Sequence, residues 1–297
     1  MINRLARRCR DHLFSLLANA VRHASRVGDP VPQLLLQSEY RMLAQSGGPL
    51  PRFDDVGFKV YSQSDEDGIL LFLFSVIGTV GKTCVEVCAE NGIECNTANL
   101  IINHGWHGLL VDGNEKAVAA GREFYRTLPE TYVFPPRFAC SWVTRGNVNE
   151  LIAGNGFSGE VDLLSLDLDG VDYWIWEAIT VVHPRVVVVE YQDILGPDRA
   201  WTVPYSDDFS AGRYPTTDGL PNFCGASLRA FMKLADRKGY RLAGVNRYGY
   251  NAFFVRNGLA DALIPAVEAK ECFNHPKVVS GMRERFPLVK DLPWVEV

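Results

Sequence analysis

The sequence has 297 residues, of which 47% are hydrophobic and 22% charged, which is enough to build one large domain around a substantial core. A formal net charge of −5, with no Lys/Arg run interleaved with aromatic residues, argues against nucleic acid as a substrate. The seven cysteines include no CxxC pair, so neither a zinc site nor a disulfide framework is predicted, and a reducing, cytoplasmic location fits best.

Hydropathy predicts no transmembrane segment. The longest apolar run, GILLFLFSVIG at 68–78, is about half of the ~20 residues that a membrane span needs. The N-terminal stretch MINRLARRCRDHLF lacks the continuous apolar core of a secretory signal. We therefore expect a soluble protein with no membrane partner.

Residues 1–57 are predicted to form a helical N-terminal extension and a linker, and residues 58–297 a Rossmann-like domain. Residues 1–45 carry apolar side chains at helical spacing, with arginines on the other faces. A Gly-Gly-Pro stretch at 47–49 indicates the linker. The basic amphipathic helix could lie on a membrane. The favoured interpretation is that it packs on the domain, or on a second subunit in a homo-oligomer.

From residue 61 onward, short apolar strands alternate with helical patterns, which is typical of βαβ units and a parallel sheet. Helices are expected from residues 96, 114 and 147 onward, around 173–181, and at 226–238, the last after a long Gly- and Pro-rich segment. The five predicted strands lie at 83–88, 108–112, 138–142, 161–167 and 185–190.

The end of the chain departs from this alternation. YRLAGVN (240–246) and NAFFVRN (251–257), joined by RYGY, have the spacing of a β-hairpin. Five parallel strands followed by a hairpin is the order of a class I methyltransferase sheet, whereas a dinucleotide-binding dehydrogenase continues with parallel units. The predicted fold class is therefore α/β: a Rossmann-like, doubly wound sheet, mostly parallel, with a C-terminal antiparallel hairpin.

Polar side chains stand at or near the carboxyl ends of these strands, where open parallel sheets bind ligands. They are Glu86, Asp112, Ser141, Asp167 and Glu190, in strand order. A carboxylate after the second strand can accept hydrogen bonds from both ribose hydroxyls, a role that suits Asp112. Capping of the next helix is the alternative for Asp112. The matching acids on neighbouring strands favour the ribose role.

The loop after the first strand, CAENGIECN, has a single glycine, Gly92. It therefore lacks the close backbone approach with which GxGxxG holds a pyrophosphate, and a diphosphate dinucleotide is disfavoured. S-adenosylmethionine (SAM) carries no phosphate. The segment Ala89, Glu90, Asn91 and Gly92 could hold the amino-acid end of SAM by polar contacts instead.

The stretch DLLSLDLDGVDYWIWE is the richest in candidate chemistry. Asp167 and Asp169 straddle the end of the fourth strand, and Glu190 ends the adjacent strand. These three carboxylates could bind Mg²⁺, which would lower the pKa of a substrate hydroxyl. Without a metal, the same acids could act as a general base. Asp172 is better explained as a cap of the following helix.

Two further segments could close the site. In YSQSDEDG, Ser62 or Ser64 can cap a helix, which leaves Tyr61 and Gln63 free to close over the cofactor. Residues 191–225 have the composition of a lid or a substrate-recognition loop. The aromatic residues that could form a wall there are Trp201, Tyr205, Phe209 and Tyr214.

These motifs resemble those of the FkbM-like group of SAM-dependent methyltransferases. The resemblance implies that Glu86 and residues 89–92 contact SAM, that Asp112 binds the ribose, that Ser141 lies at the adenine edge and that Asp167 lies at the reaction centre. It spans roughly residues 58–258 and rests on YSQSDEDGIL, VEVCAENGIECNT, GWHGLLVDGN, DLLSLDLDGVDYWIWE, PRVVVVEY and GASLRAFMKLADRKGYRL…NAFFVR.

The set is also similar to metal-dependent O-methyltransferases, in which an acid after the fourth strand and a pair after the fifth hold Mg²⁺. Here that pair would be Glu190 and Tyr191, which departs from the usual Asp/Asn type. The metal ligands would then be Asp167, Asp169 and Glu190.

The sequence thus predicts a SAM-dependent methyltransferase. The predicted reaction is O-methylation of a small-molecule acceptor, namely the hydroxyl of a sugar or secondary metabolite in natural-product biosynthesis. Asp167, Asp169 and Glu190 are the predicted catalytic residues. The alternative is a non-catalytic Rossmann-like module that docks a partner through its N-terminal helix and aromatic segment. The identity of the acceptor, and whether O, N or C is methylated, stay open.

Overall fold

A seven-stranded sheet forms the centre of the protein in the computed structural model, which describes residues 30–217 and 219–297. The strand order is β3-β2-β1-β4-β5-β10-β9, and β10 is antiparallel to both of its neighbours. This is the order of class I methyltransferases, and the predicted fold class is confirmed. The strands are β1 (Thr83–Val87), β2 (His107–Asp112), β3 (Arg137–Cys140), β4 (Gly159–Leu166), β5 (Val182–Glu190), β9 (Tyr240–Val245) and β10 (Asn251–Arg256).

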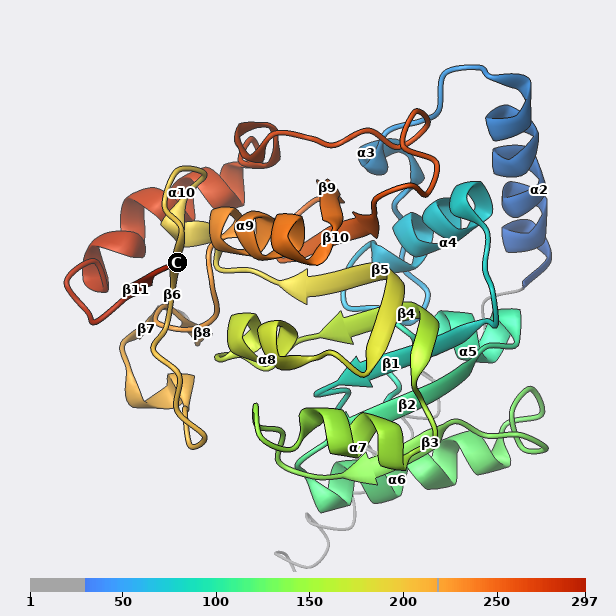
Figure 1. Ribbon diagram of the computed structural model, residues 1–297, viewed down its shortest axis with the longest axis horizontal. Coiled ribbons are helices and arrows are strands. Elements are labelled where there is room, and N and C mark those ends of the chain that lie inside the picture. Colours follow the sequence, from blue (N-terminus) through green and yellow to red (C-terminus); the bar gives the residue numbers. More distant parts are fainter. Residues whose placement is uncertain (1–29, 218) are drawn as a thin grey trace, which may run out of the picture.

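Helices lie on both faces of the sheet, and each face has its own apolar core (Figure 1). Because the central strands are buried on both faces, they read as nearly continuous runs of Val and Leu. One core includes side chains of α2 (Pro30–Ser46), α4 (Glu66–Ile77), α5 (Ala98–His104) and α6 (Glu115–Thr127). The other includes side chains of α7 (Val148–Gly154), α8 (Asp172–Ala178) and α9 (Leu228–Lys238).

The segment between β5 and α9 lies beyond the carboxyl edge of the sheet, where the arrowheads of β4 and β5 point (Figure 1). It carries three short strands and two 3₁₀ turns. The C-terminal helix α10 (Pro276–Glu284) packs on the first of these turns. The short elements are β6 (Trp201–Thr202), β7 (Thr216–Thr217), β8 (Leu220–Pro221), η1 (Asp193–Leu195) and η2 (Ala211–Arg213), followed near the C-terminus by η3 (Ala269–Cys272), η4 (Phe286–Leu288) and β11 (Val295–Glu296), which pairs with β6.

Strand β5 begins three residues before its predicted start and includes Pro184. A proline cannot donate to a strand ladder, which is why the sequence suggested a later start. The ladder between β10 and β5 extends only to Val186, so Pro184 lies beyond its last pair. The carbonyl of Pro184 still accepts a hydrogen bond from the Tyr240 hydroxyl, at 2.7 Å.

The described part of the predicted N-terminal extension packs on the domain. Helix α2 lies on α4, with Tyr40 and Phe72 in an edge-to-face contact at 5.2 Å. The expected linker contains a short helix, α3 (Phe53–Val56), and the Phe53 ring lies against Phe253 of β10 at 5.5 Å. The predicted basic helical face of residues 1–29, with its homo-oligomer contact, lies outside the described residues. Among the described helices, none combines the length and apolar character of a membrane span.

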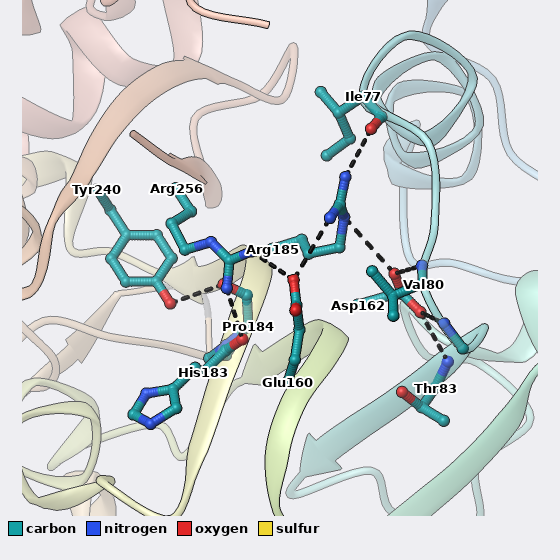
Figure 2. A network of polar contacts seen from close by, with 11 residues as sticks. Ile77, Val80, Thr83, Glu160, Asp162, His183, Pro184, Arg185, Tyr240 and Arg256 are labelled. Atoms are coloured by element: carbon teal, nitrogen blue, oxygen red, sulfur yellow. Dashed lines mark hydrogen bonds and ion pairs between the residues drawn. The ribbon is translucent and has the colours of Figure 1, made fainter. Parts of the chain in front are cut away.

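A buried carboxylate fixes the edge of the sheet opposite the carboxyl ends (Figure 2). Asp162 of β4 is fully buried and accepts hydrogen bonds from the backbone N–H groups of Val80 at 2.7 Å, Gly81 at 3.0 Å and Thr83 at 3.1 Å. These three groups form the turn from α4 into β1. The carboxylate therefore sets where β1 enters the sheet.

Arg185 of β5 completes this network. Its Nε lies 3.7 Å from Oδ1 of Asp162, and it donates a hydrogen bond to the Ile77 carbonyl at 2.7 Å (Figure 2). The Arg185 side chain is only 11% exposed, so its charge and that of Asp162 are paired away from water. The end of α4 and the starts of β1, β4 and β5 are thereby held together.

Asp162→Ala is expected to lower the free energy of unfolding by about 3–5 kcal/mol, because it leaves three N–H groups without their acceptor and removes the buried partner charge of Arg185, which keeps only the partly exposed Glu160. Asp162→Asn keeps one acceptor oxygen and should cost less. Urea denaturation monitored by circular dichroism measures both. The exposed Asp198→Ala is the control, expected within about 0.5 kcal/mol of wild type. A similar loss in both alanine variants would contradict the assignment.

Candidate active site

Four strands end in register at one edge of the sheet. Val87, Val111, Leu166 and Val189 form one continuous row across β1, β2, β4 and β5. The next residue of each chain segment is Cys88, Asp112, Asp167 and Glu190, respectively. The structure thus brings Asp112, Asp167 and Glu190 to the same edge, as strand-end residues of a parallel sheet should be.

The backbone at this edge is strained at three residues. Cys88, Glu90 and Asp169 have φ of 64°, 49° and 52°, in the left-handed region that side chains other than glycine rarely enter. Each such residue costs on the order of 1–3 kcal/mol, and the surrounding contacts must hold it in place. These residues follow β1 and β4, so the strain is concentrated in the two loops that flank the candidate site.

The N–H groups of the loop after β1 donate hydrogen bonds to acceptors within the protein. The N–H of Ala89 donates to the Val111 carbonyl at 3.0 Å, that of Glu90 to Oδ2 of Asp112 at 2.8 Å, and that of Gly92 back to the Ala89 carbonyl at 2.7 Å. A Cβ atom on Gly92 would lie 2.6 Å from Leu110, so this glycine packs on the core. The loop is therefore not an anion cradle, as its sequence predicts.

Glu86 does not lie at the wall of either cavity described below. Its carboxylate is 3% exposed and accepts hydrogen bonds from the N–H groups of Asn96 at 3.0 Å and Thr97 at 2.9 Å. The hydroxyls of Thr97 and Ser165 add two more, at 2.5 and 3.1 Å. With its oxygens occupied in this way, Glu86 positions the start of α5 and the loop before it. The contact with SAM that the resemblance implies stays a prediction.

A cavity of about 350 Å³ opens at the ends of β2, β3 and β4. Asp112 and Ser141 both line it. Asp112 accepts from the N–H groups of Glu90 at 2.8 Å and Asn114 at 2.7 Å, one on each oxygen, which leaves a lone pair on each oxygen for a ligand. The side chain that caps α6 belongs to Asn114, so capping of this helix does not explain Asp112. The lining is Cys88, Asp112, Gly113, Asn114, Ser141, Trp142, Val143, Leu168, Val171, Ser206, Asp207 and Phe209.

Residues 205–209 of the long segment form the roof of this cavity. The Trp142 indole donates to the Asp207 carbonyl at 2.6 Å, and the Tyr205 hydroxyl accepts from the Arg145 N–H at 2.8 Å. The Arg145 guanidinium also lies over the Tyr205 ring, at 5.2 Å from its centroid. Of the four predicted wall aromatics, Phe209 lines the cavity and Tyr205 fastens the roof. Trp201 and Tyr214 instead stack among other aromatics.

Three carboxylates converge beside the cavity. Asp167, Asp169 and Glu190 each offer an oxygen within 4.8 Å of the other two. Asp167 and Glu190 lie close enough to hydrogen-bond to each other, a contact that requires a proton on one of the two carboxyls. Burial, and then the charges of Asp172 and Asp169, raise the pKa of Asp167 from 3.8 to about 7. Burial and the charge of Asp167 raise the pKa of Glu190 as well.

Asp172 holds the loop that carries Asp169. Its carboxylate is 1% exposed and accepts from the N–H groups of Leu168 at 2.6 Å and Gly170 at 3.1 Å. Burial raises the pKa of Asp172 to about 6. These bonds flank Asp169 on both sides, so they help to keep its strained backbone in place.

A second cavity, of about 510 Å³, lies on the other side of this loop and is lined by Asp169 and Glu190. Gln63 also lines it. Tyr61 is 2% exposed, and its N–H donates a hydrogen bond to the buried Asp67 at 2.6 Å. It therefore supports the segment before α4 from inside the protein. The lining is Gln63, Ser64, Asp169, Glu190, Tyr191, Gln192, Asp193, Leu220, Pro221, Cys224, Gly225, Tyr248, Tyr250, Lys277 and Arg285.

Several lining residues were not found from the sequence. Trp142 is the last residue of the third predicted strand, and its place at a strand end was the available signal. Lys277 and Arg285 lie about ninety residues after β5 and reach the cavity because α10 packs on η1. Nothing in their local sequence indicates that contact.

Comparisons with known proteins find solved structures with the same type of fold, but at low sequence identity and low TM-score. No protein-family model matches the chain. No curated protein matches it either. Similar solved structures include the magnesium protoporphyrin IX methyltransferase of Synechocystis PCC 6803 with bound SAM, at 12% identity and a TM-score of 0.40, covering 65% of this chain and 78% of that one.

Two others hold S-adenosylhomocysteine (SAH). The O-methyltransferase of Bacillus cereus has 13% identity and a TM-score of 0.40, covering 73% of this chain and 88% of that one. TrmK of M. capricolum has 12% identity and a TM-score of 0.41, with coverages of 70% and 78%. Likenesses at this level carry no argument about substrate or reaction.

The raised pKa of Asp167 makes stability depend on pH. The folded protein binds this proton more tightly than the unfolded chain, so its stabilising effect is lost as pH rises from about 4 through the folded pKa of about 7. Asp167→Asn should therefore gain stability relative to wild type between pH 5 and pH 8, by on the order of 2 kcal/mol.

Urea unfolding of both proteins at the two pH values measures the difference. Asp67, whose pKa is also raised but by burial rather than by Asp167, titrates in both proteins and cancels in the comparison. Glu115→Gln, at an exposed position of α6, is the control and should show no pH-dependent difference. An Asn variant that shows no such gain would contradict the raised pKa of Asp167.

Proposed function

We propose that this protein is a SAM-dependent methyltransferase that methylates a hydroxyl group of a small acceptor, such as a sugar or another secondary metabolite. One observation carries the proposal: Leu168 lines the smaller cavity, and the next residue, Asp169, lines the larger one. A single strained loop thus separates a nucleoside-sized cavity from an acid-lined cavity, which is what transfer between two bound molecules requires.

The smaller cavity suits the nucleoside of SAM. The free lone pairs of Asp112 can accept hydrogen bonds from the two ribose hydroxyls. Trp142, Val143, Leu168 and Phe209 provide apolar walls for a flat base. The internal use of the loop N–H groups after β1 favours a cofactor without a phosphate.

The acidic group at the larger cavity suits activation of the acceptor. When bound, SAM supplies an electrophilic methyl group on its sulfonium. A hydroxyl attacking that methyl must lose its proton, and the unprotonated member of the Asp167 and Glu190 pair can accept it. A base whose pKa is raised toward neutrality is well matched to this task. Residues 205–209, which form the roof of the smaller cavity, limit access of water to it.

The donor set of Asp167, Asp169 and Glu190 also fits Mg²⁺. Carboxylate oxygens are its preferred ligands, and three of them lie within 4.8 Å of one another. A divalent ion would offset the same mutual repulsion that a shared proton now relieves, and it would act as a Lewis acid on the acceptor hydroxyl. Tyr191, the second member of the predicted pair, is buried and packs against Phe273 at 6.1 Å instead of joining the set.

Isothermal titration calorimetry with SAM and SAH tests the cofactor. We expect micromolar binding that Asp112→Ala weakens by at least tenfold, since the substitution removes both ribose acceptors. Asp112→Asn keeps the contact to the Glu90 N–H and should weaken binding less. Glu115→Gln, an exposed acid on α6, is the matched control. A folded wild-type protein that binds neither compound would refute the proposed function.

Thermal unfolding with and without Mg²⁺ or Mn²⁺ tests the metal. At pH 8, above the pKa of about 7 of Asp167, millimolar Mg²⁺ should raise the melting temperature of wild type by several degrees, because the ion binds the folded state. Asp169→Asn should reduce the shift, and the distant exposed variant Glu115→Gln should keep it. An equal shift in all three proteins would mean that the ion binds elsewhere.

A further inference from the structure

The larger cavity has charges of both signs in its wall. Asp169 and Glu190 are the acids of the wall that the proposed transfer uses. Lys277 of α10 and Arg285, the residue that follows α10, line the same cavity. The proposed methyl transfer uses the acidic residues and gives no role to these two cations.

The two cations share a single counter-charge. The Nζ of Lys277 lies 2.8 Å from Oδ2 of Asp193, and Arg285 lies 3.8 Å from Oδ1 of the same carboxylate. The Asp193 side chain is 4% exposed, so it faces these cations from inside the wall. The formal charge of the group is +1. A partly buried excess charge of this kind favours an anion at the cavity surface.

Both cations are held in place with donors to spare. Arg285 donates from Nε to Asn222 at 2.8 Å and from a terminal nitrogen to the Pro221 carbonyl at 2.8 Å, which uses two of its five N–H groups. Lys277 donates to Asp193 and lies over the Tyr250 ring, at 3.7 Å from the centroid. Because these contacts already fix the side chains, little rotamer entropy is lost when an anion binds.

We propose that the acceptor is a hydroxy acid, whose carboxylate or phosphate monoester binds to Lys277 and Arg285 while its hydroxyl lies beside Asp169 and Glu190. This inference rests on the proposed function, and it adds the class of acceptor. The two signs of charge in one wall favour one orientation: an anion is attracted at Lys277 and Arg285 and repelled by Asp169 and Glu190. A neutral sugar would gain no such orientation.

Binding of matched probes to the SAH-saturated protein tests this class. Glucuronate and glucose 6-phosphate are compared with glucose, and 3,4-dihydroxybenzoate with 3,4-dihydroxybenzamide, by calorimetry at pH 7.5. At least one anionic probe should bind about tenfold or more tightly than its neutral counterpart, and the two sugar acids distinguish carboxylate from phosphate. Equal binding within each set, or no binding of any anionic probe to protein that binds SAH, would overturn the proposal.

Charge variants separate binding from a structural role. Lys277→Gln keeps a donor for Asp193 and should remove most of the preference for the anionic probe, and Lys277→Arg should retain it. Asp193→Asn removes the shared counter-charge and should strengthen anion binding severalfold, a gain that loss of structure could not produce. The exposed Lys270→Gln is the control. An unchanged preference in Lys277→Gln would refute the subsite.

The two proposals fail separately. If SAH does not bind, the methyltransferase function is wrong, but the anionic probes and inorganic phosphate can still be titrated into the cofactor-free protein. Lys277-dependent binding in that experiment would support the anion subsite alone. Binding of SAH without any effect of Lys277 on the probes would leave the methyltransferase and exclude the hydroxy-acid acceptor.

Discussion

Parallel register is the constraint on which the candidate site depends. Because Val87, Val111, Leu166 and Val189 stand in one row, the residues that follow them meet at one edge, although they come from segments up to a hundred residues apart. Three of those four residues are acids. The same backbone hydrogen bonds that build the sheet therefore force like charges together, and the rest of the site accommodates that repulsion.

The accommodation uses carboxylates in two different ways. Glu86, Asp162 and Asp172 are buried with their oxygens occupied by internal donors, and each fixes a turn next to the sheet. Asp167 and Glu190 have raised pKa values and can share a proton, so their charge can change when a ligand or an ion arrives. Groups of the first kind make the scaffold rigid. Groups of the second kind can take part in chemistry.

The sequence predicted the fold well because its signals are local. Apolar runs bounded by polar residues located the five strands, and RYGY between two apolar runs located the hairpin of β9 and β10. Side-chain direction was harder to predict. Glu86 lies two residues before the strand-end position of Cys88, and its role depends on the loop at Asn96 and Thr97 folding back over it. Lys277 and Arg285 depend on long-range packing of α10, which no local pattern encodes.

The roof is attached by two bonds that each have one main-chain end: the Trp142 indole donates to the Asp207 carbonyl, and the Arg145 N–H donates to the Tyr205 hydroxyl. Trp142 therefore anchors position 207 whatever side chain stands there. Ser206 and Phe209, which face the cavity, can be exchanged without loosening either attachment. Such an arrangement separates closure from recognition, so the lining of this cavity could change by substitution in this short stretch while the underlying framework stays intact.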